Sequence, residues 1–304
     1  MKAGNQKQAE APLGNGQIIA SFGRRYLVEL ADASVLDCVT RGKRGDLACG
    51  DHVTLRSVSP GEGVIEKTTP RTTLLYRSDA YRQKLIAANV TQVVIVTAAV
   101  PEFHEDLIDR CLAAAEHGNM AALIVFNKCE LAESAAALAK LELYRQIGYQ
   151  LLALSAKQDI APLKPRLEKH TSVLVGQSGV GKSTIINRLV PEAVARVAEL
   201  SATLSAGRHT TTHARLYHLN ADSHIIDSPG MQEFGLHHLS ADELAHAFVE
   251  FRPLLGHCRF RNCRHLHEPD CAIAGACDAG KVSARRLASY RKLVVEIGHK
   301  KDWK

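Results

Sequence analysis

Short apolar runs typical of β-strands alternate with turn residues from Gln17 to about Pro70. Five short strands without a helical pattern predict a small N-terminal β-barrel, and a three-stranded sheet with long loops is the alternative. The polar, Gly-rich residues 1–16 predict a flexible tail, and the Arg- and Tyr-rich residues 71–84 predict a surface linker that ends this first domain. The expected strands cover residues 18–22, 26–30, 35–40, 52–57 and 63–67.

A second pattern starts at about residue 85, where apolar strands alternate with amphipathic helices. This alternation predicts a parallel sheet covered on both faces, and so an α/β domain over residues 85–237. From His238 the chain is helical, then Cys/His-rich, then helical again, which predicts a helical domain over residues 238–304. The expected strands of the middle domain are 93–98, 121–126, 151–154, 173–175 and 225–226, and its expected helices are 105–117, 133–147 and 182–189.

Composition fits a multidomain α/β protein of 304 residues with 46% hydrophobic and 23% charged residues. No apolar run reaches the ~18 residues of a membrane helix, and the N-terminus has no apolar segment of the kind found in secretion signals. We therefore expect a cytoplasmic protein without a membrane partner. The net charge is +4 over residues 1–84, −2 over 85–237 and +4 over 238–304, so the flanks favour a polyanionic partner.

A phosphate-binding motif lies between an expected strand and an expected helix. Residues 176–183 fit G-x-x-x-x-G-K-[ST], in which backbone N–H groups and the helix N-terminus surround phosphates. Lys182 is expected to neutralise the β- and γ-phosphates, and Ser183 to ligate Mg²⁺. A Gly-rich turn that binds nothing is the structural alternative. The expected phosphate ligands are Gly176, Gln177, Ser178, Gly179, Val180, Gly181, Lys182, Ser183 and Thr184.

Further motifs of a nucleotide hydrolase follow the phosphate loop. Asp227 and Gly230 form D-x-x-G after an apolar strand, where Asp227 can join the Mg²⁺ shell and the Gly230 N–H can meet a γ-phosphate. Thr211 lies in a T-T-T segment suited to a threonine that closes over Mg²⁺. His209 is the expected residue for the catalytic water, since the position after Gly230 is Met231. A plain Ser/Thr-rich loop is the alternative for this segment.

Two motifs before the phosphate loop predict selectivity for guanine. N-K-C-E ends one expected strand and S-A-K ends the next, and they resemble the N-K-x-D and S-A-K motifs of translation-factor-like GTPases. A carboxylate at position 130 can accept hydrogen bonds from the guanine N1–H and N2–H₂, which adenine lacks. The family has Asp where this chain has Glu130. The expected base ligands are Asn127, Lys128, Cys129, Glu130, Ser155, Ala156 and Lys157.

The order of these motifs is reversed relative to ordinary GTPases, in which the phosphate loop comes first. A circular permutation of the fold brings all of them to one pocket, because they lie at strand ends of the same sheet. The segment after Gly230 then leads directly into the C-terminal domain. We expect slow intrinsic hydrolysis that an outside partner accelerates.

Four clustered Cys and His residues predict a metal site. Cys258, Cys263, His265 and Cys271 offer three thiolates and one imidazole, which suit a tetrahedral structural Zn²⁺. Buried thiols without a metal are the alternative. The spacing leaves competing ligands open, namely His257, His267 and Cys277.

This combination is similar to the ribosome small subunit-dependent GTPase A family, over about residues 17–298. The shared motifs are GQSGVGKST, G-R-H-T-T-T, D-S-P-G and C-x₄-C-x-H-x-x-E-P-x-C. The resemblance implies an OB-fold barrel that binds ribosomal RNA. It also implies GTP hydrolysis stimulated by the small (30S) ribosomal subunit in late maturation of that subunit. It assigns zinc to Cys258, Cys263, His265 and Cys271 and a catalytic role to His209, with Lys182 and Thr211 in the same centre.

Two rival functions remain on the sequence alone. One is a nucleic-acid-dependent ATPase or a nucleotide kinase, and the other is a non-enzymatic RNA-binding zinc protein with a vestigial phosphate loop. Nothing in the sequence indicates a dimer, so a monomer that binds GTP and GDP is expected. Candidate RNA contacts are Arg24, Arg25, Tyr26, Arg41, Lys43 and Arg44 in the first domain, and Arg285, Arg286, Arg291, Lys292, Lys300, Lys301 and Trp303 in the last.

Overall fold

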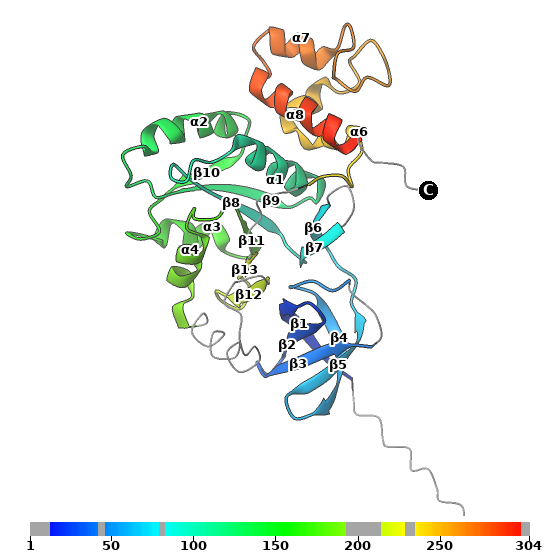
Figure 1. Ribbon diagram of the computed structural model, residues 1–304, viewed down its shortest axis with the longest axis vertical. Coiled ribbons are helices and arrows are strands. Elements are labelled where there is room, and N and C mark those ends of the chain that lie inside the picture. The colour runs from blue at the N-terminus through cyan, green and yellow to red at the C-terminus, as the bar shows by residue number, and fades with distance from the viewer. Residues whose placement is uncertain (1–12, 42–45, 79–82, 193–213, 229–234, 299–304) are drawn as a thin grey trace, which may run out of the picture.

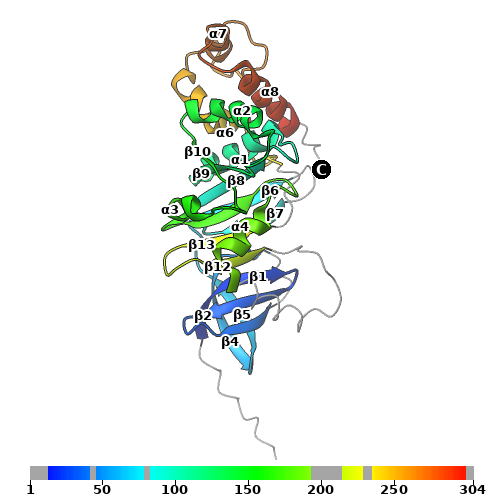
Figure 2. The ribbon, with the colours of Figure 1, turned by 90° about the vertical axis from the view of Figure 1, so that its left-hand side faces the viewer.

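The computed structural model describes residues 13–41, 46–78, 83–192, 214–228 and 235–298. The molecule is elongated, with the N-terminal strands at one end, a helix-covered sheet in the middle and the C-terminal helices at the other end (Figures 1 and 2). No helix in these ranges has both the length and the apolar character that crossing a membrane requires.

The N-terminal strands close into the predicted barrel, whose neighbours are β1–β2–β3–β5–β4 and again β1. β1 closes the ring, because Gly16 pairs with Leu30 of β2 on one side and with Val53 of β4 on the other. This strand begins at Leu13, four residues before the expected start of the first domain. The interior is apolar, with Ile18, Val28 and Leu55 at most 2% exposed. The strands are β1 (Leu13–Phe22), β2 (Arg25–Leu30), β3 (Val35–Thr40), β4 (His52–Ser59) and β5 (Glu62–Thr68).

The expected surface linker over residues 71–84 is wrong, because half of its residues belong to a two-stranded antiparallel sheet. β6 (Leu74–Ser78) pairs with β7 (Gln83–Ala88). Leu75 is only 1% exposed and packs in the core beneath α1. Arg71 fastens the hairpin to the barrel, since its Nε donates to Asp51 Oδ1 at 2.7 Å. Leu75 and Ile86 both belong to the apolar core that includes residues of α1 and the sheet, and this contact is not visible in the local sequence.

The middle domain contains the predicted parallel sheet, in the order β10–β9–β8–β11–β13. Its central strand β8 is buried along its whole length, which explains its uncharged, Val-rich sequence. A further strand, β12, pairs antiparallel with β13 and was not predicted. The strands are β8 (Gln92–Ala98), β9 (Ala121–Asn127), β10 (Gln150–Ala153), β11 (Thr171–Val175), β12 (Arg215–His218) and β13 (His224–Asp227).

Helices cover both faces of this sheet, as expected (Figure 1). α1 (Glu105–His117) and α2 (Ser134–Gln146) pack on the face that carries Val93 and Ile95 of β8. α4 (Lys182–Leu189) packs on the opposite face, against Val94 and Val96, together with the short helices η1 (Ala161–Leu163) and α3 (Lys164–Leu167). The bounds of α1 and α4 agree with the sequence prediction.

The barrel and the middle sheet are joined by backbone pairing, since Ala20 of β1 faces Arg215 of β12. The C-terminal helices lie on the far side of α1 (Figure 1). Ser240 and Glu243 form a capping box at the start of α6, which fixes where that helix begins. The elements here are α6 (Ala241–Ala247), the 3-10 helix η2 (Val249–Leu254), α7 (Ala272–Asp278) and α8 (Ala284–Gly298).

Candidate nucleotide and metal sites

The phosphate loop connects β11 to α4, in the context that the motif requires. Gly176, Gly179 and Gly181 have φ values of +144°, +81° and +102°, which side chains rarely adopt. A Cβ at Gly176 would collide with the carbonyl oxygen of Val96, and a Cβ at Gly181 with the side-chain amide of Asn127. The glycines therefore allow a tight loop that packs directly against the strand ends β8 and β9.

Lys182 and Asp227 supply opposite charges beside this loop. Lys182 Nζ donates to the carbonyl oxygens of Gly176 at 2.7 Å and Gln177 at 2.8 Å, so the ammonium lies inside the loop. Burial lowers the pKa of Lys182, against the opposing effect of Asp227. Burial raises the pKa of Asp227, although Lys182 and Arg215 counteract it. Asp227 ends β13, the neighbour of β11, and this places the carboxylate at the same sheet edge as the phosphate loop.

Asn127 joins three motifs that are far apart in the sequence. Its Nδ2 donates to the carbonyl oxygen of Val180 in the phosphate loop at 2.9 Å. Its Oδ1 accepts from the backbone N–H of Ala156 in the S-A-K motif, also at 2.9 Å. Asn127 is 2% exposed, so both bonds are shielded from water. The reversed motif order thus leads to one pocket, as the predicted circular permutation requires.

Lys128 and Glu130 lie in the turn after β9. Lys128 has φ +61°, and its Nζ donates to the carbonyl oxygens of Val100 at 2.7 Å and Gly179 at 2.8 Å. The Lys128 stem therefore lies along the phosphate loop. Glu130 is exposed, and the nearby Ser155 hydroxyl is the main cause that lowers the pKa of its carboxyl. A charged carboxylate thus remains available at the place where the guanine motif needs one.

Some of the remaining predicted nucleotide ligands lie in the part of the chain that the structure describes, and others lie outside it. Cys129 and Lys157 are exposed beside Glu130 and Ala156, and Ser178 is exposed on the phosphate loop. Ser183 and Thr184 lie in the first turn of α4, directly after the phosphate loop. The predicted roles of His209, Thr211 and Gly230 fall outside the described residues.

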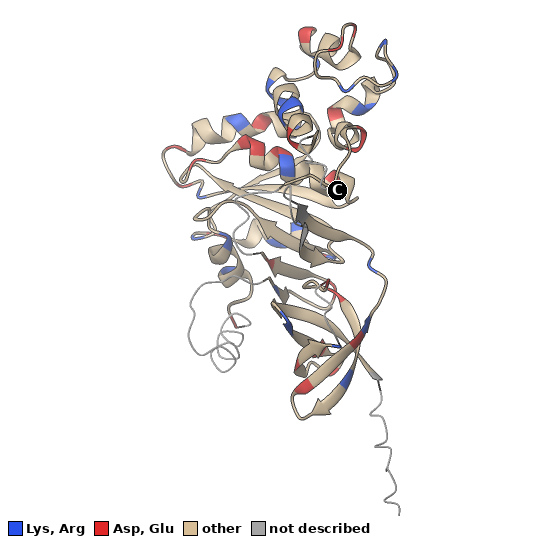
Figure 3. Ribbon diagram, turned by 45° about the vertical axis from the view of Figure 1, so that its right-hand side comes forward, with Lys and Arg blue, Asp and Glu red and all other residues tan. Residues whose placement is uncertain are grey.

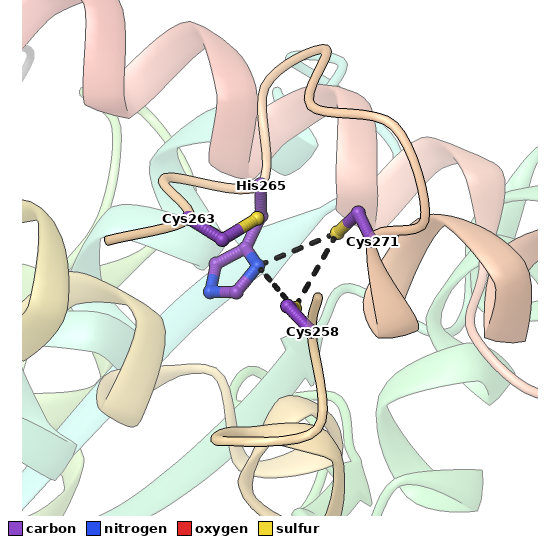
Figure 4. Close-up of side chains that lie close together, drawn as sticks. All are labelled: Cys258, Cys263, His265 and Cys271. Atoms are coloured by element: carbon purple, nitrogen blue, oxygen red, sulfur yellow. Dashed lines mark hydrogen bonds between the residues drawn. The ribbon is translucent and has the colours of Figure 1, made fainter. Parts of the chain in front are cut away.

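The Cys/His cluster forms as predicted (Figure 4). The ligand atoms of Cys258, Cys263, His265 and Cys271 all lie within 4.8 Å of one another. His265 Nδ1 is 3.5 Å from Cys258 Sγ and 3.4 Å from Cys271 Sγ, and the two sulfurs are 3.9 Å apart. Ligands about 2.0–2.3 Å from a tetrahedral ion are separated by such distances. The donor set and its spacing therefore fit a metal ion held by these residues.

The local surroundings explain both the shape and the chemistry of this cluster. Burial raises the pKa of the Cys263 thiol to about 12, so a bound cation is what makes a thiolate here at neutral pH. Glu268 accepts backbone N–H bonds from Arg264 at 2.8 Å and Leu266 at 2.9 Å, which shapes the loop around His265. The competing ligands His257, His267 and Cys277 are not part of the cluster.

Several candidate RNA contacts are excluded by burial or ion pairing. Tyr26 is 1% exposed and belongs to the barrel core, so it is unable to stack on a base. Arg286 is 1% exposed and pairs with Asp109, while Arg285 and Lys292 pair with other acids of α1. These three basic residues of α8 are thus engaged with acids of the same molecule. Basic and acidic segments both occur on the helices at this end of the molecule (Figure 3). Arg24, Arg25 and Arg41 are exposed on the barrel, and of these Arg25 pairs with Asp37 and Arg41 with Glu66.

Comparison with known proteins agrees with this geometry. The sequence model of the RsgA GTPase family matches residues 68–237. The small ribosomal subunit biogenesis GTPase RsgA of Nitrosospira multiformis is 54% identical over 298 residues, 98% of this chain and 95% of that protein. This chain belongs to the RsgA GTPase family. The protein of the same description from Nitrosomonas europaea is 48% identical and covers 100% of this chain and 98% of its own.

Solved structures extend the likeness of this RsgA-family chain to its whole fold. YjeQ from Thermotoga maritima matches with a TM-score of 0.74 at 27% identity, over 95% of this chain and 100% of that one. YloQ, described as a circularly permuted GTPase, matches with a TM-score of 0.70 at 27% identity, over 99% and 100%. The N-terminal barrel, the permuted GTPase sheet and the helical C-terminus are therefore the arrangement of an RsgA-family GTPase.

Proposed function

We propose that this chain binds and hydrolyses GTP as a biogenesis factor of the small (30S) ribosomal subunit, and that the subunit stimulates its hydrolysis. The observation that carries the proposal is Asn127, whose amide is bonded to both the phosphate loop and the S-A-K motif. An isolated phosphate loop is common to many NTPases, whereas this three-way junction is the geometry of a base-selective GTP site. The names of the relatives supply the ribosomal assignment.

Each residue of the site has a distinct task in this proposal. The phosphate loop and Lys182 bind the phosphates and balance their charge, while Glu130 and the Ala156 N–H select guanine. Ser183 and Asp227 would hold Mg²⁺, together with Thr211; bound Mg²⁺ balances negative charge on the phosphates. His209 remains our proposal for the residue that orients water, and Met231 after Gly230 is the reason for seeking such a residue elsewhere.

The flanking domains have supporting roles. Residues 17–84 are proposed to bind ribosomal RNA through the exposed arginines of the barrel, whose first strand begins earlier than expected, at Leu13. Residues 85–237 form the GTPase domain, and residues 238–304 the domain held by one structural Zn²⁺. The three thiols and one imidazole support zinc over Mg²⁺ or Ca²⁺, because those ions prefer oxygen ligands. We further propose a cytoplasmic monomer that exchanges GTP and GDP.

The test is steady-state hydrolysis of GTP and of ATP, with and without purified small ribosomal subunits, at fixed salt and Mg²⁺. Slow GTP turnover that rises by an order of magnitude or more with subunits is expected, with little use of ATP. Lys182→Ala should abolish turnover, which excludes a contaminating hydrolase. His209→Ala should retain GTP binding and lose the stimulated rate.

The rival functions predict different results in the same assay. Equal use of ATP would favour a nucleic-acid-dependent ATPase, and Asn127 and Glu130 would then have no role in base selection. Binding without turnover, even with subunits, would favour a non-enzymatic RNA-binding zinc protein. Either result would contradict the proposed function.

A further inference from the structure

The turn that carries Glu130 is held in shape by a serine outside every recognised motif. The carbonyl oxygen of Lys128 accepts two hydrogen bonds, from the backbone N–H of Leu131 at 3.0 Å and from Ser134 Oγ at 3.0 Å. Ser134 is the first residue of α2 and is 7% exposed. The N-cap residue of this helix is Glu133, which makes no side-chain capping bond, and the Ser134 hydroxyl connects the start of the helix to the Lys128 carbonyl.

Lys128 needs this support because its backbone is strained. Its φ of +61° lies in the left-handed region, which costs a residue with a side chain roughly 1 kcal/mol or more. The side chain is fixed at its far end by Val100 and Gly179, and the backbone at its near end by Leu131 and Ser134. Both ends of Lys128 are thereby tied, one to the phosphate loop and one to α2.

Glu130 depends on the same turn. It lies between Lys128 and Leu131, the two residues whose backbone groups close the turn. Glu130 is exposed and has one methylene more than the Asp of the family motif, so its side chain has more rotamers to restrict than an Asp would have. The direction in which Glu130 leaves the backbone is therefore set by the turn, and Ser134 is the side chain that fixes the turn to the rigid start of α2.

We propose that Ser134 is a positioning residue for guanine selectivity: through the Lys128 carbonyl it fixes the turn from which Glu130 reaches the base. This inference rests on the proposed function, because it assumes that Glu130 contacts guanine. Ser134 acts through Lys128, and the phosphate loop has supports of its own in the bonds that Lys182 and Asn127 make to it. The main effect of Ser134 therefore falls on base recognition rather than on phosphate binding.

The test is equilibrium binding of fluorescent GDP, IDP and ADP to the full chain. IDP lacks the 2-amino group of guanine, so it reports one of the two contacts of Glu130, and ADP reports phosphate binding alone. Ser134→Ala should weaken the binding of GDP about threefold to tenfold, which is the effect of losing one hydrogen bond. The same substitution should weaken the binding of IDP less and leave the affinity for ADP unchanged. Ser134→Thr keeps the hydroxyl and should restore the wild-type ratio of GDP to ADP affinity.

A matched control separates positioning from folding. Ser223 is also a buried serine with a hydroxyl bonded to backbone, since it accepts from the Lys169 N–H at 2.8 Å, but it lies away from the site. Ser223→Ala should keep the wild-type ratio even if its melting temperature falls as much as that of Ser134→Ala. An unchanged GDP affinity in Ser134→Ala, or an equal loss for GDP and ADP, overturns the inference. A wild-type chain without preference for GDP over ADP contradicts the proposed function itself, before any variant is measured.

Discussion

Asp109 of α1 accepts a 2.7 Å hydrogen bond from Nη1 of Arg286 on α8, and the two residues are 0% and 1% exposed. The guanidinium also donates from Nε to Glu250 at 2.7 Å and lies 4.1 Å from the centre of the Phe248 ring. Tyr144 of α2 donates to the same Asp109 carboxylate at 2.8 Å. A fully paired, buried charge cluster thus fastens the C-terminal helices to the GTPase domain.

Removal of Arg286 should strongly destabilise the protein. Arg286→Met keeps much of the side-chain volume but leaves the Asp109 and Glu250 carboxylates buried with fewer partners. We expect a loss of about 3–5 kcal/mol in the free energy of unfolding, measured by urea denaturation. Arg259→Met is the control, because the Arg259–Asp270 pair is exposed and should contribute less than about 1 kcal/mol. Equal effects of the two variants would contradict a stabilising role for the buried cluster.

The same cluster predicts a loss of stability in acid. Burial alone raises the pKa of Asp109, but the charges of Arg286 and Arg285 outweigh it, so the pKa is lower than in the unfolded chain. A lowered pKa stabilises the folded state above the unfolded pKa of about 3.9, and this contribution is lost as pH falls through the folded value. The urea midpoint should therefore fall below about pH 4. The Asp109→Asn variant should have a lower urea midpoint at pH 7 and a smaller fall of that midpoint in acid. If the fall in acid were as large as in the wild type, Asp109 would not be the group responsible.

Gly181 should be irreplaceable for nucleotide binding. Its φ is +102°, and a Cβ there would collide with the Asn127 amide that bonds Val180. We expect Gly181→Ala to weaken GDP about tenfold or more in a fluorescence titration. Gly148 has the same φ of +102° but open space around its Cβ position. Gly148→Ala should lower the free energy of unfolding by about 1 kcal/mol, because alanine tolerates this backbone conformation less well than glycine. Its affinity for GDP should stay at the wild-type value.

Metal removal should unfold the Cys/His loop. We expect about one Zn²⁺ per chain by elemental analysis, since the cluster offers four ligands and tetrahedral structural sites are closed. Cys271→Ser should lose the metal and lower the melting temperature, because metal affinity here is also folding free energy. Cys277→Ser removes a nearby thiol outside the cluster, and this variant should retain the metal. If the Cys271→Ser variant kept its zinc and the Cys277→Ser variant lost it, the proposed set of ligands would be wrong.

Where local sequence dictates local structure, the predictions agree with the fold. The glycines of residues 176–181 require positive φ, and the structure has it at three of them. Helices α1 and α4 have the predicted bounds. The four metal ligands are also those named from the sequence, although spacing alone left His257, His267 and Cys277 open until the cluster was seen.

The failures have a common cause. Residues 71–84 look like a surface linker because the burial of Leu75 depends on the core that it shares with residues of α1 and the sheet. β12 has four residues of mixed character and is a strand only because β13 and β1 lie beside it. Tyr26 and Arg286 resemble RNA-binding residues by type, but the fold places both in the interior.

The sequence by itself determined the chemistry of this protein: the phosphate loop, the guanine motifs, their permuted order and the three thiols with one imidazole. Those features depend on residue type and on spacing within short stretches of chain. The tertiary structure decided which of the many arginines pair internally, how the C-terminal helices attach to α1 and which serine supports the turn of Glu130. Such contacts join residues that are distant in the sequence, and their energy comes from burial and from pairing across elements, which only the assembled fold supplies.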